Sequence, residues 1–174
     1  MKTIEIRRHS IRSKTGDHLS QQGVMLARLV GENLGPFDKV ITSTLPRAFE
    51  TAIAMGFAVD EQSELISSYG DDVEAEIPWP QTFEVYAQAF SRGGAVTKYG
   101  KKLAKFYGEL ADFLADGRSS LVINHGGIVE MSAAACLAGT GLKVQGEAAS
   151  HCEGICLYYE DEKVVRAEVL RVSK

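Results

Sequence analysis

The sequence predicts an α/β fold, a three-layer α/β/α sandwich built around a mostly parallel mixed sheet. Two observations carry this prediction. Short apolar stretches typical of strands alternate along the chain with amphipathic stretches typical of helices, and this alternation indicates βα units with a parallel sheet. Residues 154–172 instead carry two strand patterns around a polar turn at 160–163, which adds an antiparallel hairpin.

The first strand–helix unit occupies residues 3–35. Residues 3–7 alternate, with Ile4 and Ile6 on one face, and this period predicts a strand. A broad apolar stripe over 19–35 predicts a helix, with Ser20 as its N-cap and Gly35 at its end.

The second unit occupies residues 39–60. Residues 39–43 form a short apolar run, which indicates a buried strand. A helix is expected over 44–56, with Thr44 as a possible cap and Pro46 in its first turn. Residues 57–60 are a candidate third strand.

The rest of the chain alternates in the same way after a less regular middle. Residues 68–81 are acidic and resemble a loop, and residues 82–91 have a helical pattern that Gly93 and Gly94 interrupt. An amphipathic helix is expected over 100–117, ending at Gly117. A hydrophobic strand at 119–124 and a helix at 128–139 follow.

Length and composition favour one globular domain. The chain of 174 residues is 45% hydrophobic and 24% charged, so we expect a single domain over 1–174 with a short insertion at about 61–97 near the active site. A net charge of −4 argues against nucleic-acid binding through bulk charge. No apolar run approaches the length of a membrane-spanning helix, so we expect no membrane partner. Three cysteines without framework spacing favour a reducing, cytoplasmic location.

Three expected strand ends carry basic side chains that are far apart in sequence. The first supplies Arg8, His9 and Arg12, the second Arg47 and the third His125. Because ligands bind at the carboxyl ends of the strands in such sheets, we expect these groups to converge. Guanidiniums match phosphate oxygens, and a neutral imidazole can act as a nucleophile toward phosphorus. Such a cationic pocket stabilises phosphoryl transfer without a metal or other cofactor.

Four motifs in a fixed order give a resemblance. Residues 8–10 read Arg-His-Ser, residues 19–23 read "LSQQG", residues 43–52 read "STLPRAFETA", and residues 124–127 read "NHGG". The chain therefore resembles the histidine phosphatase superfamily, which includes cofactor-dependent phosphoglycerate mutases and many small phosphatases. The resemblance covers residues 4–138 and implies a phosphoglycerate mutase-like fold.

The resemblance assigns roles to the basic residues. It implies that His9 is the nucleophile that becomes a phosphohistidine, and that Arg8, Arg47 and His125 complete the phosphate pocket. The Arg-His-x-x-Arg spacing resembles the acid phosphatase and phytase branch, which implies that Arg12 also holds phosphate. The glycine that usually follows the nucleophile is Ser10 here.

The proton donor departs from the family pattern. The usual glutamate position falls on Ser67, and the aspartate that follows the second histidine in the other branch is Gly126. A general acid needs hydrogen-bond reach and a suitable pKa, and the nearby acidic stretch offers Glu74 first and Asp72 second. The alternative is that this stretch is a solvated loop. His18, in the loop before the first helix, is a possible lining residue, although such a histidine is more often exposed. His151, which precedes the penultimate strand, is the other possible lining residue.

The sequence thus predicts a metal-independent phosphatase that hydrolyses phosphate monoesters or phosphohistidine through phospho-His9. Its partner is a small phosphorylated substrate or a phosphoprotein, and a good leaving group would compensate for the missing acid. A phosphomutase of the phosphoglycerate mutase type is the alternative, although the insertion at 61–97 is short for one. A non-catalytic phosphate-binding module is the other alternative.

Overall fold

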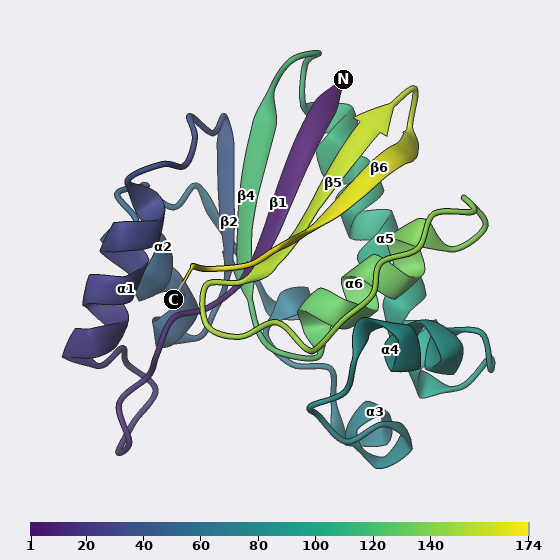
Figure 1. Ribbon diagram of the computed structural model, residues 1–174, viewed down its shortest axis with the longest axis horizontal. Helices are drawn as coiled ribbons and strands as arrows, with labels where there is room; N and C mark the ends of the chain where they lie inside the picture. Colours follow the sequence, from purple (N-terminus) through teal and green to yellow (C-terminus); the bar gives the residue numbers. More distant parts are fainter. Residues whose placement is uncertain (174) are drawn as a thin grey trace.

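A six-stranded mixed sheet forms the centre of the protein. The computed structural model describes residues 1–173, and the strands lie in the order β3-β2-β4-β1-β5-β6 (Figure 1). Strands β3, β2, β4 and β1 are mutually parallel, and β5 runs antiparallel to both of its neighbours. The strands are β1 (Lys2–Arg8), β2 (Lys39–Ser43), β3 (Glu61–Ser63), β4 (Ser119–Asn124), β5 (Gly154–Glu160) and β6 (Lys163–Leu170).

Helices cover both faces of the sheet. Two helices, α1 (Gln21–Gly31) and α2 (Pro46–Ala54), lie on one side, with the larger group on the other (Figure 1). That group comprises η1 (Glu64–Ile66), α3 (Asp71–Glu76), α4 (Phe83–Phe90), α5 (Ala95–Phe113) and α6 (Ile128–Leu137). In β4, Leu121 and Ile123 belong to the core under α1 and α2, whereas Val122 belongs to the opposite core, as the two-residue period of a strand requires. The predicted α/β/α sandwich with a mostly parallel mixed sheet is confirmed.

The N-cap of α1 agrees with the sequence prediction, and that of α2 differs from it. Ser20 caps α1 as expected, because its hydroxyl oxygen accepts a hydrogen bond from Gly23 N at 3.0 Å. Thr44 does not cap α2. The N-cap is Leu45, without a side-chain bond, and Pro46 occupies the first turn. The hydroxyl of Thr44 instead contacts Ser67 at 3.0 Å.

The third strand begins later than expected. It covers Glu61–Ser63 rather than residues 57–60. Phe57 and Val59 pack against the core under α1 and α2, and the carboxylate of Asp60 accepts the backbone N–H of Val40 at 2.7 Å. The backbone N–H of Asp60 also donates to the carbonyl of Val40 at 2.9 Å, and regular strand pairing starts one residue later.

The acidic stretch within 68–81 contains a short helix, α3, where a loop was expected. Asp71, Asp72 and Glu74 lie in its first turn, where carboxylates interact favourably with the helix dipole. Val73 and Ile77 are buried in the core, four residues apart on one face. Two apolar residues are too few to reveal a helical period in the sequence.

The strand register brings the predicted site residues together. Arg8 pairs with Asn124 across the parallel strands β1 and β4, so the residues that follow, His9 and His125, leave the sheet side by side. Arg47 lies at the start of α2, just after β2 on the other side of β4.

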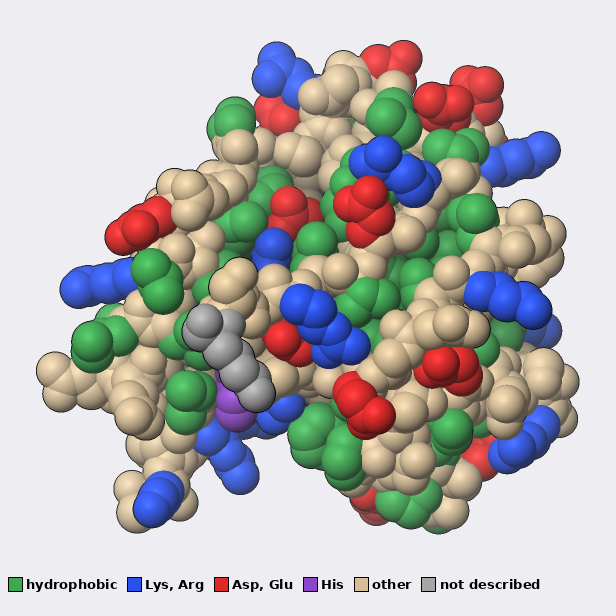
Figure 2. All heavy atoms as spheres, viewed as in Figure 1, with side chains coloured by type: hydrophobic (Ala, Val, Ile, Leu, Met, Phe, Trp, Pro, Cys, Tyr) green, Lys and Arg blue, Asp and Glu red, His purple; other side chains and the backbone are tan. Residues whose placement is uncertain are grey.

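Charged side chains are mixed on the face shown in Figure 2, where Lys and Arg alternate with Asp and Glu. This mixture agrees with a net charge of only −4. None of the helices in the described part of the chain is long and apolar enough to cross a membrane.

Candidate active site

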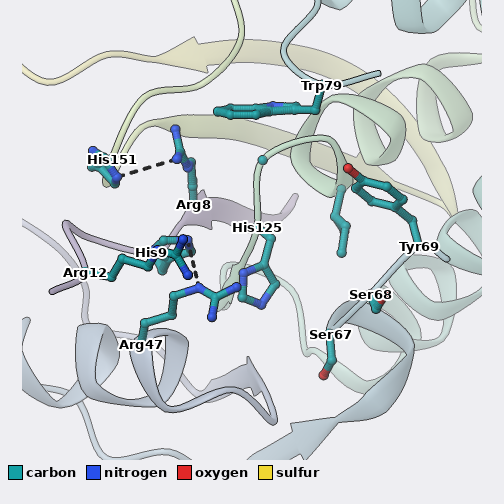
Figure 3. Close-up of a pocket in the computed structure, with 12 residues that line it drawn as sticks. Arg8, His9, Arg12, Arg47, Ser67, Ser68, Tyr69, Trp79, His125 and His151 are labelled. Carbon is teal, nitrogen blue, oxygen red and sulfur yellow. Dashed lines mark hydrogen bonds between the residues drawn. The ribbon is translucent and has the colours of Figure 1, made fainter. Parts of the chain in front are cut away.

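A pocket of about 320 Å³ opens where β1 and β4 end. Figure 3 shows its side chains converging from β1, α2, the β4–α6 turn and the segments around 68, 79 and 151. Its lining residues are Arg8, His9, Arg12, Arg47, Ser67, Ser68, Tyr69, Trp79, His125, Gly126, Ile128 and His151. The structure therefore brings together the basic residues of the three strand ends, Arg8, His9, Arg12, Arg47 and His125.

His9 is buried and held in one tautomer from two sides. Its Nε2 lies 3.2 Å from Arg47 Nε, which can only donate, so Nε2 carries the lone pair. Its Nδ1 then bears the proton and donates to the carbonyl of Ser10 at 2.6 Å. Burial, and the nearby His125 and Arg8, lower the pKa of His9 to about 2. The ring is therefore neutral near pH 7, with its unprotonated nitrogen facing a guanidinium.

Ser10 fits the turn after β1 without the glycine that relatives usually have. The residue is buried, its hydroxyl donates to the carbonyl of Gly23 at 2.7 Å, and its N–H donates to Thr51 Oγ1 at 2.9 Å. A side chain at Gly23 would collide with the backbone of Ile11. These contacts clamp the turn that carries His9 against α1 and α2.

The three arginines differ in exposure. Arg8 is the most enclosed: it donates to the carbonyl of Ala149 at 3.2 Å, and its guanidinium carbon lies 4.7 Å from the centre of the Trp79 ring. The side chain of Arg47 is 15% exposed and that of Arg12 is 57% exposed. Burial lowers the pKa of both Arg8 and Arg47, although neither guanidinium loses its charge near neutrality.

His125 lies beside His9, with 5.1 Å between the two ring centroids. Its Nε2 is 2.6 Å from the hydroxyl of Ser43, which also accepts the N–H of Leu45. We assign the hydroxyl proton to the Ser43–Nε2 bond, which leaves Nδ1 of His125 as a donor. That Nδ1 is buried without a partner among the described residues. Burial first, then Arg47 and Arg8, lower the pKa of His125 to about 3.

The proton-donor positions hold no carboxylate. Ser67 lines the pocket and donates to the carbonyl of Ser63 at 2.8 Å. Among the lining residues that the structure describes, none is Asp or Glu. Glu74 and Asp72 lie exposed on α3, and the carboxylate of Glu74 accepts the Tyr69 hydroxyl at 2.6 Å. Tyr69 is thus the contact that links Glu74 to the pocket.

The structure adds residues that the sequence did not single out, chiefly Trp79, Tyr69 and Ser68. In Figure 3 the indole of Trp79 lies above Arg8 as the roof of the pocket. A methyl group at Gly126 would come within 2.6 Å of that indole. The available signal was a lone tryptophan between two prolines in the segment 61–97.

Of the two remaining histidines, one lines the pocket and the other does not. His151 lines the pocket, with its Nε2 3.5 Å from Arg8 Nη2. His18 does not line it, and its ring contacts the carboxylate of Glu50 instead. That carboxylate raises the pKa of His18.

The comparisons agree with this geometry. The model of the histidine phosphatase superfamily, branch 1, matches residues 3–168. None of the curated proteins matches the chain. A phosphoserine phosphatase from Entamoeba histolytica, in complex with 3-phosphoglyceric acid, superposes with a TM-score of 0.67 at 15% identity, covering 99% of this chain and 98% of that one.

Two further solved structures have the same fold. A mycobacterial glucosyl-3-phosphoglycerate phosphatase in complex with VO3 has a TM-score of 0.66 at 18% identity, over 99% of this chain and 100% of that one. A phosphoglycerate mutase from Bacillus anthracis has a TM-score of 0.62 at 14% identity, over 98% and 92%. Because the family model spans nearly the whole sequence, the chain belongs to branch 1 of the histidine phosphatase superfamily.

Proposed function

We propose that the protein is a metal-independent phosphatase that works through a phosphohistidine on His9. The observation that carries the proposal is a neutral, buried His9 with its Nε2 against Arg47 Nε at 3.2 Å, inside a pocket lined by two further arginines. A phosphate that displaces the Arg47 bond would present its phosphorus to the lone pair of Nε2.

The proposed reaction has two steps on the same nitrogen. His9 Nε2 attacks phosphorus, and the bond to the leaving group breaks. Water then attacks the phosphohistidine, and the nitrogen–phosphorus bond breaks to release inorganic phosphate. Arg8, Arg12 and Arg47 balance the charge on the phosphoryl oxygens in both steps. The unpaired Nδ1 of His125 supplies a further donor.

The absence of a lining carboxylate among the described residues favours substrates with good leaving groups. We therefore propose phosphohistidine or an aryl phosphate as the substrate class, on a small molecule or on a phosphoprotein.

We further propose that residues 1–174 form a single domain in which the segment 61–97 builds one wall of the pocket. The free cysteines at 136, 152 and 156 suit a cytoplasmic location, and the mixed charges of Figure 2 suit a partner other than nucleic acid.

A phosphate-binding module is the second candidate, and the same missing carboxylate favours it. A phosphomutase finds less support, because the segment 61–97 is short for one and the side chain of Arg12, which lines the pocket, is 57% exposed.

His9→Ala tests the proposal. Turnover of p-nitrophenyl phosphate, assayed with EDTA present, should fall below a few per cent of wild type, because the nucleophile is lost while the arginines remain. Mass spectrometry of the wild type after brief mixing with substrate should find one phosphoryl group on His9. Residual turnover near wild type, or a phosphoryl group on another residue, would contradict the proposal. His18→Gln, which removes a histidine outside the pocket, is the matched control.

A further inference from the structure

His151 is a third histidine of the pocket, and the two-step reaction above gives it no task. It lies in the turn before β5, whose backbone is tied to the end of β1: Cys152 N donates to the carbonyl of Arg8 at 3.1 Å. Glu153 N closes the same turn onto the carbonyl of Ser150. The ring centroids of His151 and His9 are 5.9 Å apart. The fold therefore holds His151 at the pocket rather than leaving it on a free loop.

Its ring presents a lone pair to the pocket. Arg8 Nη2 lies 3.5 Å from Nε2 of His151 (Figure 3), and a guanidinium can only donate. On this contact we assign the lone pair of the ring to Nε2. Burial first and Arg8 second lower the pKa of His151 to about 4, so the ring is neutral in the empty pocket.

A bound phosphate would change the charge around His151 from positive to negative. Its oxygens would accept hydrogen bonds from Arg8 Nη2, the atom that Nε2 of His151 also faces. Two negative charges would then oppose the effect of the guanidinium. A lone pair and an anionic oxygen cannot bond to each other without a proton between them, so anion binding favours protonation of Nε2.

The other charged groups around His151 do not alter this argument. Arg8, at the end of β1, and the neutral His9, just after it, face the ring. In its own turn, the carboxylate of Glu153 is held by Arg171 at 2.7 Å. From α6, the buried Glu130 accepts the N–H groups of Gly127 and Ala149 and exerts its charge on Arg8.

We propose, on the basis of the proposed phosphatase function, that His151 is the general acid and base of the reaction and gains its proton when the phosphate binds. In the first step, His9 Nε2 bonds to phosphorus, the bond to the leaving oxygen breaks, and that oxygen takes the proton of His151 Nε2. In the second step, water bonds to phosphorus, its proton returns to His151 Nε2, and the bond to His9 breaks. In this scheme His151 supplies the proton that a carboxylate at position 67 or 126 would otherwise give, which extends the proposed substrate class to alkyl phosphates.

Proton uptake on anion binding is the direct test. Sulfate is the probe, since this dianion does not itself titrate near neutrality. Calorimetric titrations of the wild type in buffers of different ionisation enthalpy should show uptake approaching about one proton per sulfate near pH 6. His151→Gln should bind sulfate without uptake, and His18→Gln should behave as wild type. Sulfate binding without proton uptake by the wild type would overturn the proposal.

Leaving-group dependence is the second test, and it separates proton transfer from mere positioning. His151→Gln should lower kcat/KM by roughly 10²-fold on an alkyl phosphate, which needs protonation of its leaving oxygen, and by less than about 3-fold on p-nitrophenyl phosphate. An equal loss on both substrates, or a selective loss in Glu74→Gln instead, would overturn the assignment. Failure of the underlying phosphatase proposal would appear differently, as an active His9→Ala variant with sulfate-linked proton uptake intact.

Discussion

At the residue scale, the carboxylate of Asp17 forms ion pairs with two of the pocket's guanidiniums. It lies 3.1 Å from Arg47 Nη1 and 4.0 Å from Arg12 Nη1. A bound phosphate competes with this carboxylate for both. Asp17→Asn should therefore strengthen inhibition by inorganic phosphate by roughly 2- to 5-fold, the size of a lost surface ion pair. Inhibition constants at low and high salt measure the effect. Unchanged or weaker inhibition would contradict it, and Asp116→Asn, at the N-terminal ion pair, is the control.

Arg47 and Arg12 should contribute unequally to catalysis. The side chain of Arg47 is 15% exposed and touches His9, whereas that of Arg12 is 57% exposed. Solvent screens an exposed charge far more than a buried one. Arg47→Ala should lower kcat/KM by about 10²- to 10³-fold, as loss of a preorganised donor does, and Arg12→Ala by only about 10-fold. Steady-state kinetics on an aryl phosphate measure both, and an equal or reversed order would refute the argument.

At the element scale, the roof of the pocket depends on a glycine in the β4–α6 turn. A methyl group at Gly126 would lie 2.6 Å from the Trp79 indole, so Gly126→Ala should push the indole away from Arg8. Losing a cation–π contact of about 1 kcal/mol should raise KM by roughly 3- to 10-fold. Trp79 is the one tryptophan of the sequence, and its fluorescence should shift to the red.

Gly108→Ala is the matched control for that change. Gly108 lies in α5, and a methyl group there would meet no atom of the described residues within 4 Å. The fluorescence and KM of Gly108→Ala should equal those of the wild type, while the alanine stabilises the helix by about 0.5–1 kcal/mol. An unshifted emission in Gly126→Ala would mean that the indole does not depend on the glycine.

Elements with long apolar periods could be predicted from the sequence, and elements defined by contacts could not. The stripe of α1 and the alternation of β1 are local patterns. Helix α3 was missed because Val73 and Ile77 become core residues only when they pack in the cluster of the opposite layer. Strand β3 was misplaced because its start depends on Asp60 bonding to Val40 in the neighbouring strand.

The same distinction applies to the pocket. His9, Arg47 and His125 stand in motifs beside strand ends, and the parallel order of β1, β2 and β4 brings them together. The place of Trp79 depends on its long-range contact with Gly126. No short-range pattern records that contact.

At the scale of the whole molecule, the buried neutral histidines make stability depend on pH. The pKa of His9 falls from 6.5 to about 2 and that of His125 from 6.5 to about 3 on folding. Below pH 6.5 these two imidazoles therefore bind protons in the unfolded chain that they do not bind in the folded protein. The free energy of unfolding should fall as the pH drops from about 6.5 toward 3, by up to about 1.4 kcal/mol per pH unit for each imidazole.

Urea unfolding of the wild type and His9→Asn between about pH 7 and pH 5, in buffer free of phosphate and sulfate, measures this slope. His9→Asn should be shallower by close to one proton, because asparagine does not titrate. Burial raises the pKa of Glu130, which opposes the slope as its carboxylate gains a proton in the folded protein. Glu130 is present in both proteins, so the difference between them isolates the imidazole. Parallel slopes would mean that His9 is as free to accept a proton in the folded protein as in the unfolded chain, and the neutral nucleophile would lose its basis.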